Sequence, residues 1–592
     1  MHKRQGSALI LVITISTLLL LITCAAALNS ISNISLTNEE KIKTKLEFAC
    51  ESGLKRAKAK IEESFNNSFL TYLEPEISFQ GTDYDDTDKT PEEKKYSDET
   101  YTPGNPAYYS FIYHSNEDNR DIVVKYAITE DIDWQKSQSY TTYKLNIESI
   151  AYSPGYGWVG MTEKSAARRT TLFMYQVFFQ NDLEILPGPN FDLKGLIHTN
   201  ENLYLNANSG STLKIFTDSL TSAEQIFRGR LDRNETTGTV EISTGNEDGD
   251  LITMEDGDDA NNSGWKDIAS EKWTGTLRDK NLGATRLEAP KLESFQPGGY
   301  YDNNSGLKIQ VIAKGKTTSK TTYKITYNGS STTYTSTQLG GALKDTEMYD
   351  RREYGTSKKV RVTNVDIQKL ASMVGYPTNG LIYMTRDDAV ADSDNDPYTP
   401  DSTRNVAGFK LYNGSTLPAA TTFVSNLPTY IKGDFNLHSS SDSSADTWKP
   451  CAVIADAIDL LSNNWQDSAS NTTQTASSTT YNTVFITGNV PTKSGQYSGG
   501  LENFPRFLEN WDGKNVNISG GFIQLFRSNY ATGLWGGSYY SPPTRNWKNE
   551  DRFANLTDLP PTYANLFPSA NLGLAFSNWT KISKSEATLG EN

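Results

Sequence analysis

The feature that most constrains this chain is an uncharged, apolar run at residues 7–28. As an α-helix rising about 1.5 Å per residue, this run is about 33 Å long, enough to cross the hydrocarbon core of a bilayer. A short basic leader, residues 1–6, precedes it, and no later apolar run approaches its length. The sequence therefore predicts one segment that enters a membrane, with the rest of the chain on one side.

The predicted helix continues beyond this run as an amphipathic segment. Apolar residues return every three or four positions, while lysines and glutamates occupy the other faces. The apolar positions are Ile42, Leu46, Ala49, Cys50, Gly53, Leu54, Ala57, Ile61 and Phe65. Residues 37–40, Thr-Asn-Glu-Glu, have the pattern of a capping box, at which a helix can kink or restart. We expect one long helix over residues 7–65 whose second half packs its apolar stripe against a downstream element.

Three interpretations of the N-terminus remain open at this stage. A secretory signal peptide would be cleaved near Ala25-Ala26-Ala27, although its apolar core is normally shorter than this one. A lipoprotein would begin at Cys24, but Thr23 is bulkier than the small residue normally found before such a cysteine. Cleavage after Gly6 would instead leave the whole apolar helix on the mature protein.

The N-terminal motifs carry a resemblance to a known family. Arg4-Gln5-Gly6-Ser7-Ala8-Leu9, followed by the apolar run and by Ala49-Cys50-Glu51-Ser52-Gly53-Leu54, resembles the N-terminal region of PilX-type pilus-assembly proteins. The resemblance implies a prepilin leader that a prepilin peptidase cleaves between Gly6 and Ser7. It also implies a single inner-membrane helix that packs against other pilin or pseudopilin subunits.

One position departs from the usual pilin pattern. Pilins usually carry glutamate at the fifth mature position, where it pairs with the free N-terminus of a neighbouring subunit, and here that position is Leu11. This difference argues against a bulk filament subunit. It is compatible with a minor, tip or pseudopilin-like role.

Composition indicates a turn-rich β protein. The chain has 592 residues, and only 36% of them are hydrophobic, with many Thr, Ser, Asn, Gly and Tyr. The formal net charge of −15 argues against a nucleic-acid partner, because such binding depends on neutralising phosphates. We expect an α+β fold that is mainly β, with room for several domains.

The chain after the helix divides into two predicted parts. Residues 66–182 combine a polar, acidic excursion with strands at 122–128, 143–152 and 170–179, which we expect to form a small antiparallel sheet under the helix stripe. Residues 183–570 contain short apolar runs separated by Asn, Gly, Asp and Ser, a pattern that favours a β-solenoid over the alternative, a β-sandwich. Within them we expect an insertion at about 228–360, and after them a weakly patterned tail at 571–592.

Several later segments carry a second resemblance, to large PilX-like envelope proteins. The first of them, residues 178–189, contains Gln180-Asn181-Asp182-Leu183. The segments are residues 178–189, 195–205, 349–353, 430–436, 455–465, 502–511, 531–535 and 540–547. This resemblance implies a shared architecture and location, and it implies nothing specific about activity.

Candidate sites are few. Asp392, Asp394 and Asp396 alternate as in calcium-binding loops, but the glycine and glutamate that complete an EF-hand loop are missing, so the alternative is an ordinary acidic turn. Cys50 and Cys451 could form a disulfide outside the cytoplasm, or could be two separately buried thiols. Apart from calcium, the sequence suggests no cofactor.

Two further features have both a functional and a structural interpretation. Asp456 and Asp459 lie three residues apart and could act as an acid/base pair on a polysaccharide, or could hold turns by accepting backbone N–H groups. Aromatic residues gather near the C-terminus and could stack on sugars or close the end of the β domain. They are Trp511, Phe522, Phe526, Tyr530, Trp535, Tyr539, Tyr540 and Trp547. We assign no catalytic residue.

The expected function is that of a non-enzymatic, membrane-anchored minor pilin or pseudopilin-like protein in type IV pilus or secretion-filament assembly. It would sit in the inner membrane through one helix, with a large periplasmic or extracellular domain, and its bulk suits a pilus tip. The alternatives are a surface adhesin that binds cells, a host ligand or glycans, and a β-helix polysaccharide-degrading enzyme.

Overall fold

The structure is a computed structural model. In the first helix, the side chains of residues 1–10, 31–38 and 62–67 are not described. The structure describes residues 5–67, 94–96, 108–115, 120–130, 141–153, 157–244, 249–287, 289–313, 321–355, 357–393, 400, 403–442, 444–469, 473–537, 539–554, 558–561, 570–576 and 579–589. Most of the predicted polar excursion at 66–120 therefore lies outside the described residues. The described part is mainly β, with a long N-terminal helix and several sheets.

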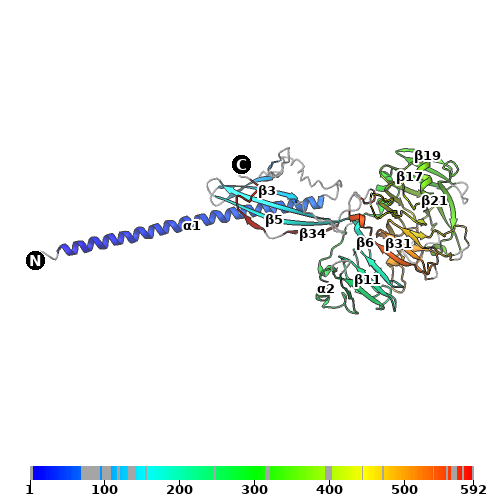
Figure 1. Cartoon of the computed structure of the whole chain (residues 1–592), viewed down its shortest axis with the longest axis horizontal. Coiled ribbons are helices and arrows are strands. Elements are labelled where there is room, and N and C mark those ends of the chain that lie inside the picture. The colour runs from blue at the N-terminus through cyan, green and yellow to red at the C-terminus, as the bar shows by residue number, and fades with distance from the viewer. Residues whose placement is uncertain are drawn as a thin grey trace.

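The long helix α1 (Gln5–Asn67) is continuous and projects from the rest of the molecule as a rod (Figure 1). It passes through residues 37–40 without a break, so the predicted restart at the capping box does not occur. Residues Leu11–Ser30 are long and apolar enough to cross a membrane, a property that a signal sequence near the N-terminus shares. The expected apolar helix is confirmed at this level.

The second half of α1 lies on an antiparallel sheet with the strand order β1-β2-β3-β4-β5-β34, and β35 also pairs with β5. We call α1 with this sheet the helix-bearing module. Its strands are β1 (Lys94–Tyr96), β2 (Tyr108–Ser115), β3 (Arg120–Glu130), β4 (Thr141–Ser153), β5 (Gly157–Thr170), β34 (Ala570–Phe576) and β35 (Thr580–Ile582). The strands predicted at 122–128 and 143–152 fall within β3 and β4, whereas β2 and β5 were not predicted.

The third predicted strand of this sheet, 170–179, was wrong as a single element. Thr170 ends β5, the short 3₁₀ helix η1 (Leu172–Met174) follows, and β6 (Tyr175–Phe179) then enters a different sheet. Apolar and aromatic content alone does not distinguish one strand from two that are joined by a turn of helix.

The C-terminal residues return to the helix-bearing module, so the prediction of a weakly patterned tail at 571–592 needs correction. β34 and β35 both pair antiparallel with β5. Beyond them, the Glu148 carboxylate accepts hydrogen bonds from the backbone N–H groups of Thr588 and Leu589, both at 2.8 Å. Because β34 is the last-but-one strand of the chain, everything between β5 and β34 is inserted into this module.

We call the inserted part, from β6 to β33, the distal domain. Its strands are short and mostly parallel, and they lie in four sheets. The three-stranded sheet holds β13 (Ile226–Arg228), β10 (Leu203–Leu205) and β7 (Leu183–Ile185). The seven-stranded sheet holds β15 (Leu251–Thr253), β14 (Thr239–Ser243), β11 (Thr212–Phe216), β8 (Phe191–Lys194), β33 (Thr544–Lys548), β31 (Asn515–Ser519) and β28 (Thr479–Tyr481).

Two larger groups of strands complete the distal domain. The twelve-stranded sheet holds β16 (Leu277–Arg278), β12 (Leu220–Ser222), β9 (Leu196–Thr199), β6, β32 (Phe522–Arg527), β29 (Val484–Asn489), β26 (Cys451–Ala455), β24 (Thr421–Ser425), β22 (Leu381–Arg386), β17 (Leu307–Ala313), β18 (Thr321–Tyr327) and β19 (Ser330–Tyr334). The six-stranded sheet holds β20 (Leu343–Met348), β21 (Val360–Asp366), β23 (Ala407–Tyr412), β25 (Thr429–Lys432), β27 (Ile458–Leu461) and β30 (Pro505–Phe507). The short apolar runs noted in the sequence fall on these strands.

The chain enters the twelve-stranded sheet in its middle. From β6 it proceeds outward through β9 and β12 to one end, and it then continues from β17 near the other end. It returns through β22, β24, β26, β29 and β32, and β32 finally pairs in parallel with β6. Residues more than 300 positions apart, such as Phe522 and Val177, are therefore neighbours.

Strands between residues 228 and 360, the predicted insertion, pair with strands of these same sheets. β14 pairs in parallel with β11, and β17 pairs in parallel with β22. The helix α2 (Trp265–Trp273) lies beside β16 and buries two tryptophans in the same core. The remaining helices are α3 (Tyr300–Asn304), α4 (Arg351–Tyr354) and α5 (Ile367–Met373), with the 3₁₀ helices η2 (Lys280–Leu282), η3 (Leu292–Phe295), η5 (Leu501–Asn503) and η6 (Asp551–Ala554).

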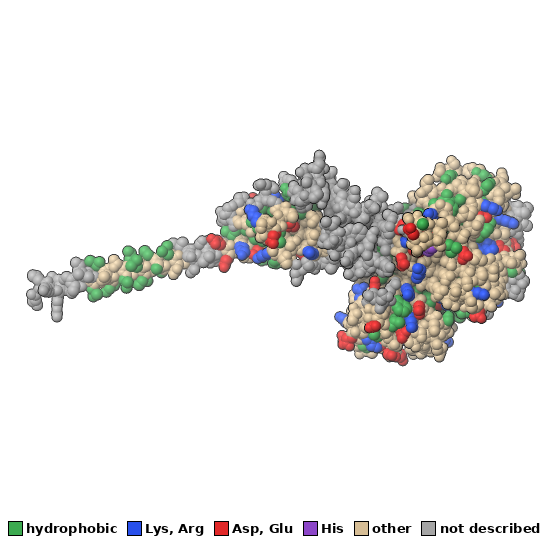
Figure 2. Space-filling view, viewed as in Figure 1, with side chains coloured by type: hydrophobic (Ala, Val, Ile, Leu, Met, Phe, Trp, Pro, Cys, Tyr) green, Lys and Arg blue, Asp and Glu red, His purple; other side chains and the backbone are tan. Residues whose placement is uncertain are grey.

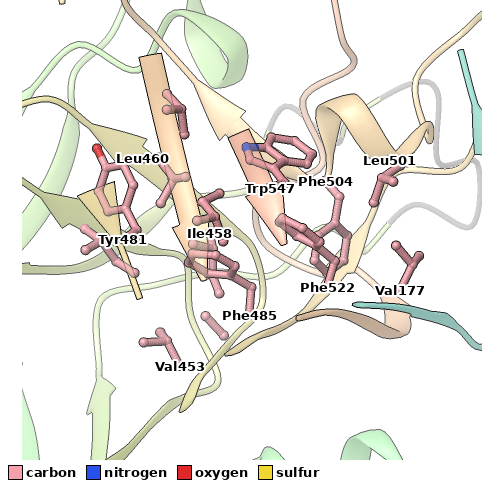
Figure 3. Packing of buried hydrophobic residues seen from close by; sticks show 14 of the residues in the cluster. Val177, Val453, Ile458, Leu460, Tyr481, Phe485, Leu501, Phe504, Phe522 and Trp547 are labelled. Atoms are coloured by element: carbon pink, nitrogen blue, oxygen red, sulfur yellow. The ribbon is translucent and has the colours of Figure 1, made fainter. Parts of the chain in front are cut away.

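The core of the distal domain is built from alternate side chains of these strands. In β33 the exposed fraction alternates along the strand, with Arg545 and Trp547 buried and their neighbours exposed. Figure 3 shows Trp547 packed beside Phe522 and Phe504, with Phe485 and Ile458 next to them. The apolar area removed from water here provides the main stabilisation of the domain.

Candidate functional site

The first half of α1 exposes a continuous apolar surface. Its large side chains are between 49% exposed, at Ile15, and 67% exposed, at Leu28. None of the most apolar window of Leu11–Ser30 is buried inside the protein. Figure 2 shows these side chains in green around the rod. Gly6 and Ser7, the predicted cleavage site, lie within the first turns of α1.

The second half of α1 buries the predicted apolar stripe. Leu46, Ala49, Cys50, Leu54, Ala57 and Ile61 are at most 2% exposed. They form one hydrophobic cluster with residues of β2 to β5, among them Val124, Tyr126, Ile147 and Met161. The expectation that the stripe packs on the sheet is confirmed. Phe65, the last predicted position, has no described side chain.

Gly53 lets the helix approach the sheet closely. A Cβ atom at this position would lie 2.2 Å from the Ser149 Oγ on β4, so no larger residue fits without a shift. One turn earlier, the Ser149 hydroxyl donates to the Cys50 carbonyl oxygen at 2.9 Å, and the Cys50 thiol donates to the Ser149 carbonyl oxygen at 3.1 Å. These contacts fix the helix on β4.

An ion pair adds to this attachment. The Lys58 ammonium lies 2.6 Å from the carboxylate of Glu163 on β5, and the Glu163 side chain is fully buried. A buried carboxylate that loses its partner is strongly destabilising, so the pair specifies where α1 sits on the sheet. The helix-bearing module is therefore held by packing, by paired hydrogen bonds and by one buried charge pair.

The two buried cysteines are separate free thiols. Cys50 lies in the cluster under α1, while Cys451 on β26 lies in the core of the distal domain. Burial raises the pKa of both thiols to about 12. The suggested disulfide between them is not formed, and the interpretation as two separately buried thiols describes the structure. Cys24, in contrast, is exposed on the apolar half of α1.

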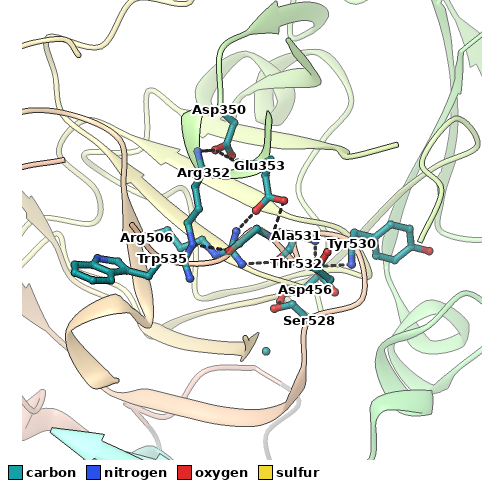
Figure 4. Close-up of polar contacts among 12 residues, drawn as sticks. Asp350, Arg352, Glu353, Asp456, Arg506, Ser528, Tyr530, Ala531, Thr532 and Trp535 are labelled. Carbon is teal, nitrogen blue, oxygen red and sulfur yellow. Dashed lines mark hydrogen bonds and ion pairs between the residues drawn. The ribbon is translucent and has the colours of Figure 1, made fainter. Parts of the chain in front are cut away.

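The distal domain contains a buried network of charged side chains (Figure 4). The Glu353 carboxylate is bound by the guanidinium groups of Arg404, at 2.5 Å, and Arg506, and by the Gly533 N–H at 3.0 Å. Arg352 donates to the Gly533 carbonyl oxygen at 2.9 Å. Burial alone would raise the pKa of Glu353, but Arg506 and Arg404 outweigh burial and hold that pKa below its ordinary value.

Asp350 caps the helix that carries Glu353. Its carboxylate accepts hydrogen bonds from the N–H groups of Arg352 and Glu353, at 3.0 and 3.2 Å, and from the Tyr430 hydroxyl at 2.6 Å. A capping carboxylate satisfies N–H groups that the first turn leaves unpaired. Asp350, Arg352 and Glu353 therefore belong to an internal clamp rather than to a surface patch.

The predicted acid pair has a structural place in the same region. Asp456 is 3% exposed and accepts three backbone hydrogen bonds, from Asn529 at 2.5 Å, Tyr530 at 3.1 Å and Ala531 at 2.8 Å. Burial raises the pKa of Asp456 to about 6 despite these donors. Asp459 is fully buried, and burial, with Asp350 nearby, raises its pKa well above the ordinary value. Asp456 therefore holds the turn that follows β32 by accepting backbone N–H groups, which is the second of the two interpretations given for it in the sequence.

The predicted calcium loop is only partly described. The Asp392 carboxylate accepts a hydrogen bond from the Thr532 hydroxyl at 2.6 Å, and its N–H donates to the Asn529 carbonyl oxygen at 2.7 Å. Asp394 and Asp396 lie outside the described residues. Within the described ranges, no group of three His, Cys, Asp or Glu side chains is arranged to hold a metal ion.

The C-terminal aromatic residues are divided between core and surface. Trp511, Phe522 and Trp547 are at most 2% exposed and belong to the main core cluster. Tyr530 and Tyr540 pack against that cluster from outside. This arrangement fits the interpretation that these residues bury the last strands of the domain.

A groove on the distal domain, lined by both polar and apolar residues, was not predicted. It has a volume of about 610 Å³ and lies over β8, β33, β31 and β28. Its lining is Asp192, Lys194, Leu437, His438, Thr480, Asn482, Asn517, Ile518, Ser519, Arg545, Asn546, Trp547 and Lys548. The signal in the sequence was the alternation of polar and apolar residues in 515–519, whereas 544–548 contains a single apolar residue, Trp547. However, nothing local indicates that these strands lie beside β8.

Comparison of the chain with protein-family models, with curated proteins and with solved structures found no match, so the arguments about function rest on the residues and geometry described above.

Proposed function

We propose that this chain is a membrane-anchored, pilin-like subunit of a type IV pilus or related secretion filament, without enzymatic activity. The observation that carries the proposal is the division of α1, whose first half is bare and apolar while its second half is packed on a sheet. Each exposed Leu, Ile or Val favours insertion into a bilayer by about 0.3–0.6 kcal/mol. A helix with this division supports insertion of one half while the module stays outside.

The resemblance of the N-terminus to PilX-type proteins supplies the route of assembly. A prepilin peptidase would cleave between Gly6 and Ser7, and the apolar half of α1 would then hold the subunit in the inner membrane. The same half would later pack against helices of other pilin or pseudopilin subunits. Leu11, in place of the usual glutamate, supports a minor rather than a bulk subunit.

The distal domain supports a position at the tip of the filament. We propose that its short parallel strands form a β-solenoid on the periplasmic or extracellular side. Strands such as β24 and β26 are paired in register and recur along the chain, which is typical of such coils. A domain of this bulk, inserted between β5 and β34, is hard to accommodate in a wall of subunits packed side by side.

The first test is the N-terminus of the mature protein. The full chain is produced in a host that has a prepilin peptidase, and the membrane fraction is analysed by N-terminal sequencing. We expect the mature chain to begin at Ser7 and to need detergent for extraction. A Gly6→Leu variant, as matched control, should keep its leader. A mature chain that begins at Leu28 and is soluble would overturn the proposal.

The second test uses Cys24, which is exposed, while Cys50 and Cys451 are buried. If apolar halves of α1 pack side by side, oxidation of membranes should cross-link neighbouring subunits through Cys24. The Cys24→Ser variant should give no cross-link. The same experiment includes co-expressed pilins that carry a cysteine at the matching helix position. If the wild-type chain cross-links neither to a second copy nor to such a pilin, the assembly step is contradicted.

A further inference from the structure

The groove of the distal domain has a floor made of outward-facing polar side chains. Along β8 and β33, exposed and buried residues alternate, so that Asp192, Lys194, Asn546 and Lys548 face solvent. The residues between them, such as Leu193, point into the core. The groove therefore lies on the solvent side of a sheet whose other side is fully packed, and the sheet provides a rigid support.

Part of this floor is a ladder of amide and hydroxyl groups. The Asn546 amide donates to the Asn517 side-chain oxygen at 2.8 Å, and the Asn517 amide donates to the Thr480 hydroxyl at 3.1 Å. The three residues are directly opposite one another on adjacent parallel strands. They are therefore spaced by about 4.8 Å, the distance between strands. These bonds orient the amides while the remaining donor and acceptor positions face the groove.

Two lysines lie next to this ladder. Lys194 and Lys548 are directly opposite each other on β8 and β33. Like charges in this position repel each other. The Lys194 ammonium lies 5.3 Å from the centre of the Phe216 ring, and within the described ranges Lys548 takes part in no ion pair. An anionic group placed between the two ammonium groups would relieve this repulsion.

The rim of the groove is also polar and fixed. The His438 ring stacks on Trp448 with 5.4 Å between ring centres, and its nitrogens lie 2.6 Å from Asp446 and 2.9 Å from Glu550. The Trp547 ring belongs to the core and contacts Phe522, so it offers no platform for stacking. Recognition in this groove therefore relies on hydrogen bonds and charge, together with contact to the apolar part of its lining, rather than on stacking.

We propose that this groove binds an acidic oligosaccharide. A uronate carboxylate would lie between Lys194 and Lys548, and sugar hydroxyls would bond to the Thr480–Asn517–Asn546 ladder and to the Asp192 carboxylate. The amides held in place by the ladder, together with the Asp192 carboxylate, match the paired donor and acceptor character of sugar hydroxyls. A nucleic acid is disfavoured, because its binding depends on neutralising many successive phosphates and the groove presents few cations. This site goes beyond the proposed function and does not depend on it.

The test measures binding by the detergent-solubilised full chain with isothermal titration calorimetry. The probe is hexagalacturonate, with maltohexaose as the neutral sugar and inorganic phosphate and a single-stranded DNA oligonucleotide as anions without the same hydroxyls. We expect binding of hexagalacturonate alone, and weaker binding as salt increases, because the charged contribution is screened.

Variants locate the site. Lys194→Gln combined with Lys548→Gln should lower the affinity at least tenfold, and Asn517→Leu should lower it as well. Lys266→Gln is the matched control, since Lys266 is exposed on α2 and does not line the groove. Thermal unfolding should be similar for the control and the double variant, because both lysines of the groove are exposed.

Three results would overturn the proposal. They are no binding of hexagalacturonate, equal binding of maltohexaose, phosphate or DNA, and an affinity that the variants of the groove leave unchanged. None of them bears on the N-terminus, so failure here is distinguishable from failure of the assembly proposal.

Discussion

The helix-bearing module and the distal domain bury their apolar surface in different ways. The module uses long antiparallel strands, such as β5 (Gly157–Thr170), and one helix that covers them. The distal domain uses short parallel strands, such as β25 (Thr429–Lys432), whose sheets cover one another. The first arrangement leaves half of its helix bare and buries one charge pair, whereas the second encloses a network of several charged groups. The bare surface is therefore concentrated on a helix segment that is long and apolar enough to cross a membrane.

The connection between the two regions explains how both can exist in one chain. The distal domain leaves the module after β5 and returns at β34, and both strands belong to the same sheet. A large domain can therefore be inserted without disturbing the contact between α1 and β4. Two buried thiols, Cys50 in the module and Cys451 in the distal domain, allow the regions to be followed separately by thiol labelling during denaturation.

The largest expected effect comes from the buried charges of the distal domain. Glu353→Leu would leave Arg404 and Arg506 buried without their shared carboxylate, which should cost about 3–5 kcal/mol of unfolding free energy. We expect Cys451 to become reactive at a lower urea concentration, while the transition at Cys50 stays in place. The measurement is mass spectrometry of the labelled chain across a urea series.

An exposed ion pair provides the control for this variant. Arg233→Gln removes a partner of Glu235 at the surface, and such pairs contribute about 0–1 kcal/mol. It should leave both thiol transitions nearly unchanged. If Glu353→Leu moved both thiols together, the two regions would unfold as one unit and the comparison would fail.

The next effect is a dependence of distal-domain stability on pH. Burial raises the pKa of Asp456 from 3.8 to about 6, so folding binds a proton between these values. The stabilising contribution is therefore complete below about pH 4 and is lost as the pH rises through 6, by about 3 kcal/mol at most.

Asp456→Asn, which cannot titrate, isolates this contribution. We expect the unfolding free energy of the wild type, minus that of Asp456→Asn, to fall as the pH rises from 4 to 7. Tryptophan fluorescence in urea at each pH provides the measurement. A difference that stays constant or rises would show that the three backbone donors outweigh burial.

A smaller effect is expected at the contact between α1 and β4. The added Cβ of Gly53→Ala meets the Ser149 hydroxyl, and overpacking of this kind costs about 1–3 kcal/mol. Alanine regains up to about 1 kcal/mol through its better helix propensity. We expect a net loss, seen as earlier labelling of Cys50 with no change at Cys451.

Ala59→Ser, at an exposed position of the same helix, is the matched control. It should leave the transition at Cys50 in place. A stabilised Gly53→Ala variant would mean that the helix does not depend on close approach to β4, and that the module tolerates a looser contact than the structure has.

The sequence predicted the parts of this fold that depend on local patterns. Apolar residues spaced three and four positions apart predicted α1 and its buried stripe. Short apolar runs predicted strands such as β23 and β29. β5 was not predicted, because it buries Glu163 and Ser165 and lacks clear alternation of apolar residues. Its register is fixed by the neighbouring strand β4 rather than by its own pattern.

Long-range pairing accounts for most of what the sequence could not predict. Nothing near Phe522 indicates that it pairs with Val177, and nothing in 570–576 indicates a return to β5. The groove depends on the same kind of closure, because β33 supplies Lys548 and β8 supplies Lys194. Pairings of this kind follow from the packing of the whole domain, which local propensity does not contain.

The smallest expected effect lies at the rim of the groove, where His438 meets Glu550 and Asp446. The hydrogen bond with Glu550, followed by that with Asp446, raises the pKa of His438 despite partial burial. The imidazolium therefore stabilises the folded chain below its ordinary pKa near 6.5 and loses this contribution as the pH rises through the raised value. For a side chain about one-third exposed, such pairs contribute less than about 1 kcal/mol.

This step is measurable because it falls in a different pH range from that of Asp456. We expect the stability of the wild type, relative to His438→Gln, to decrease above pH 6.5, whereas the contribution of Asp456 is already lost near pH 6. Two separate steps would show that the interior and the rim of the distal domain titrate independently. A single step that either substitution removes would instead show that the titrations of His438 and Asp456 are coupled, so that the rim of the groove and the interior of the domain do not behave independently.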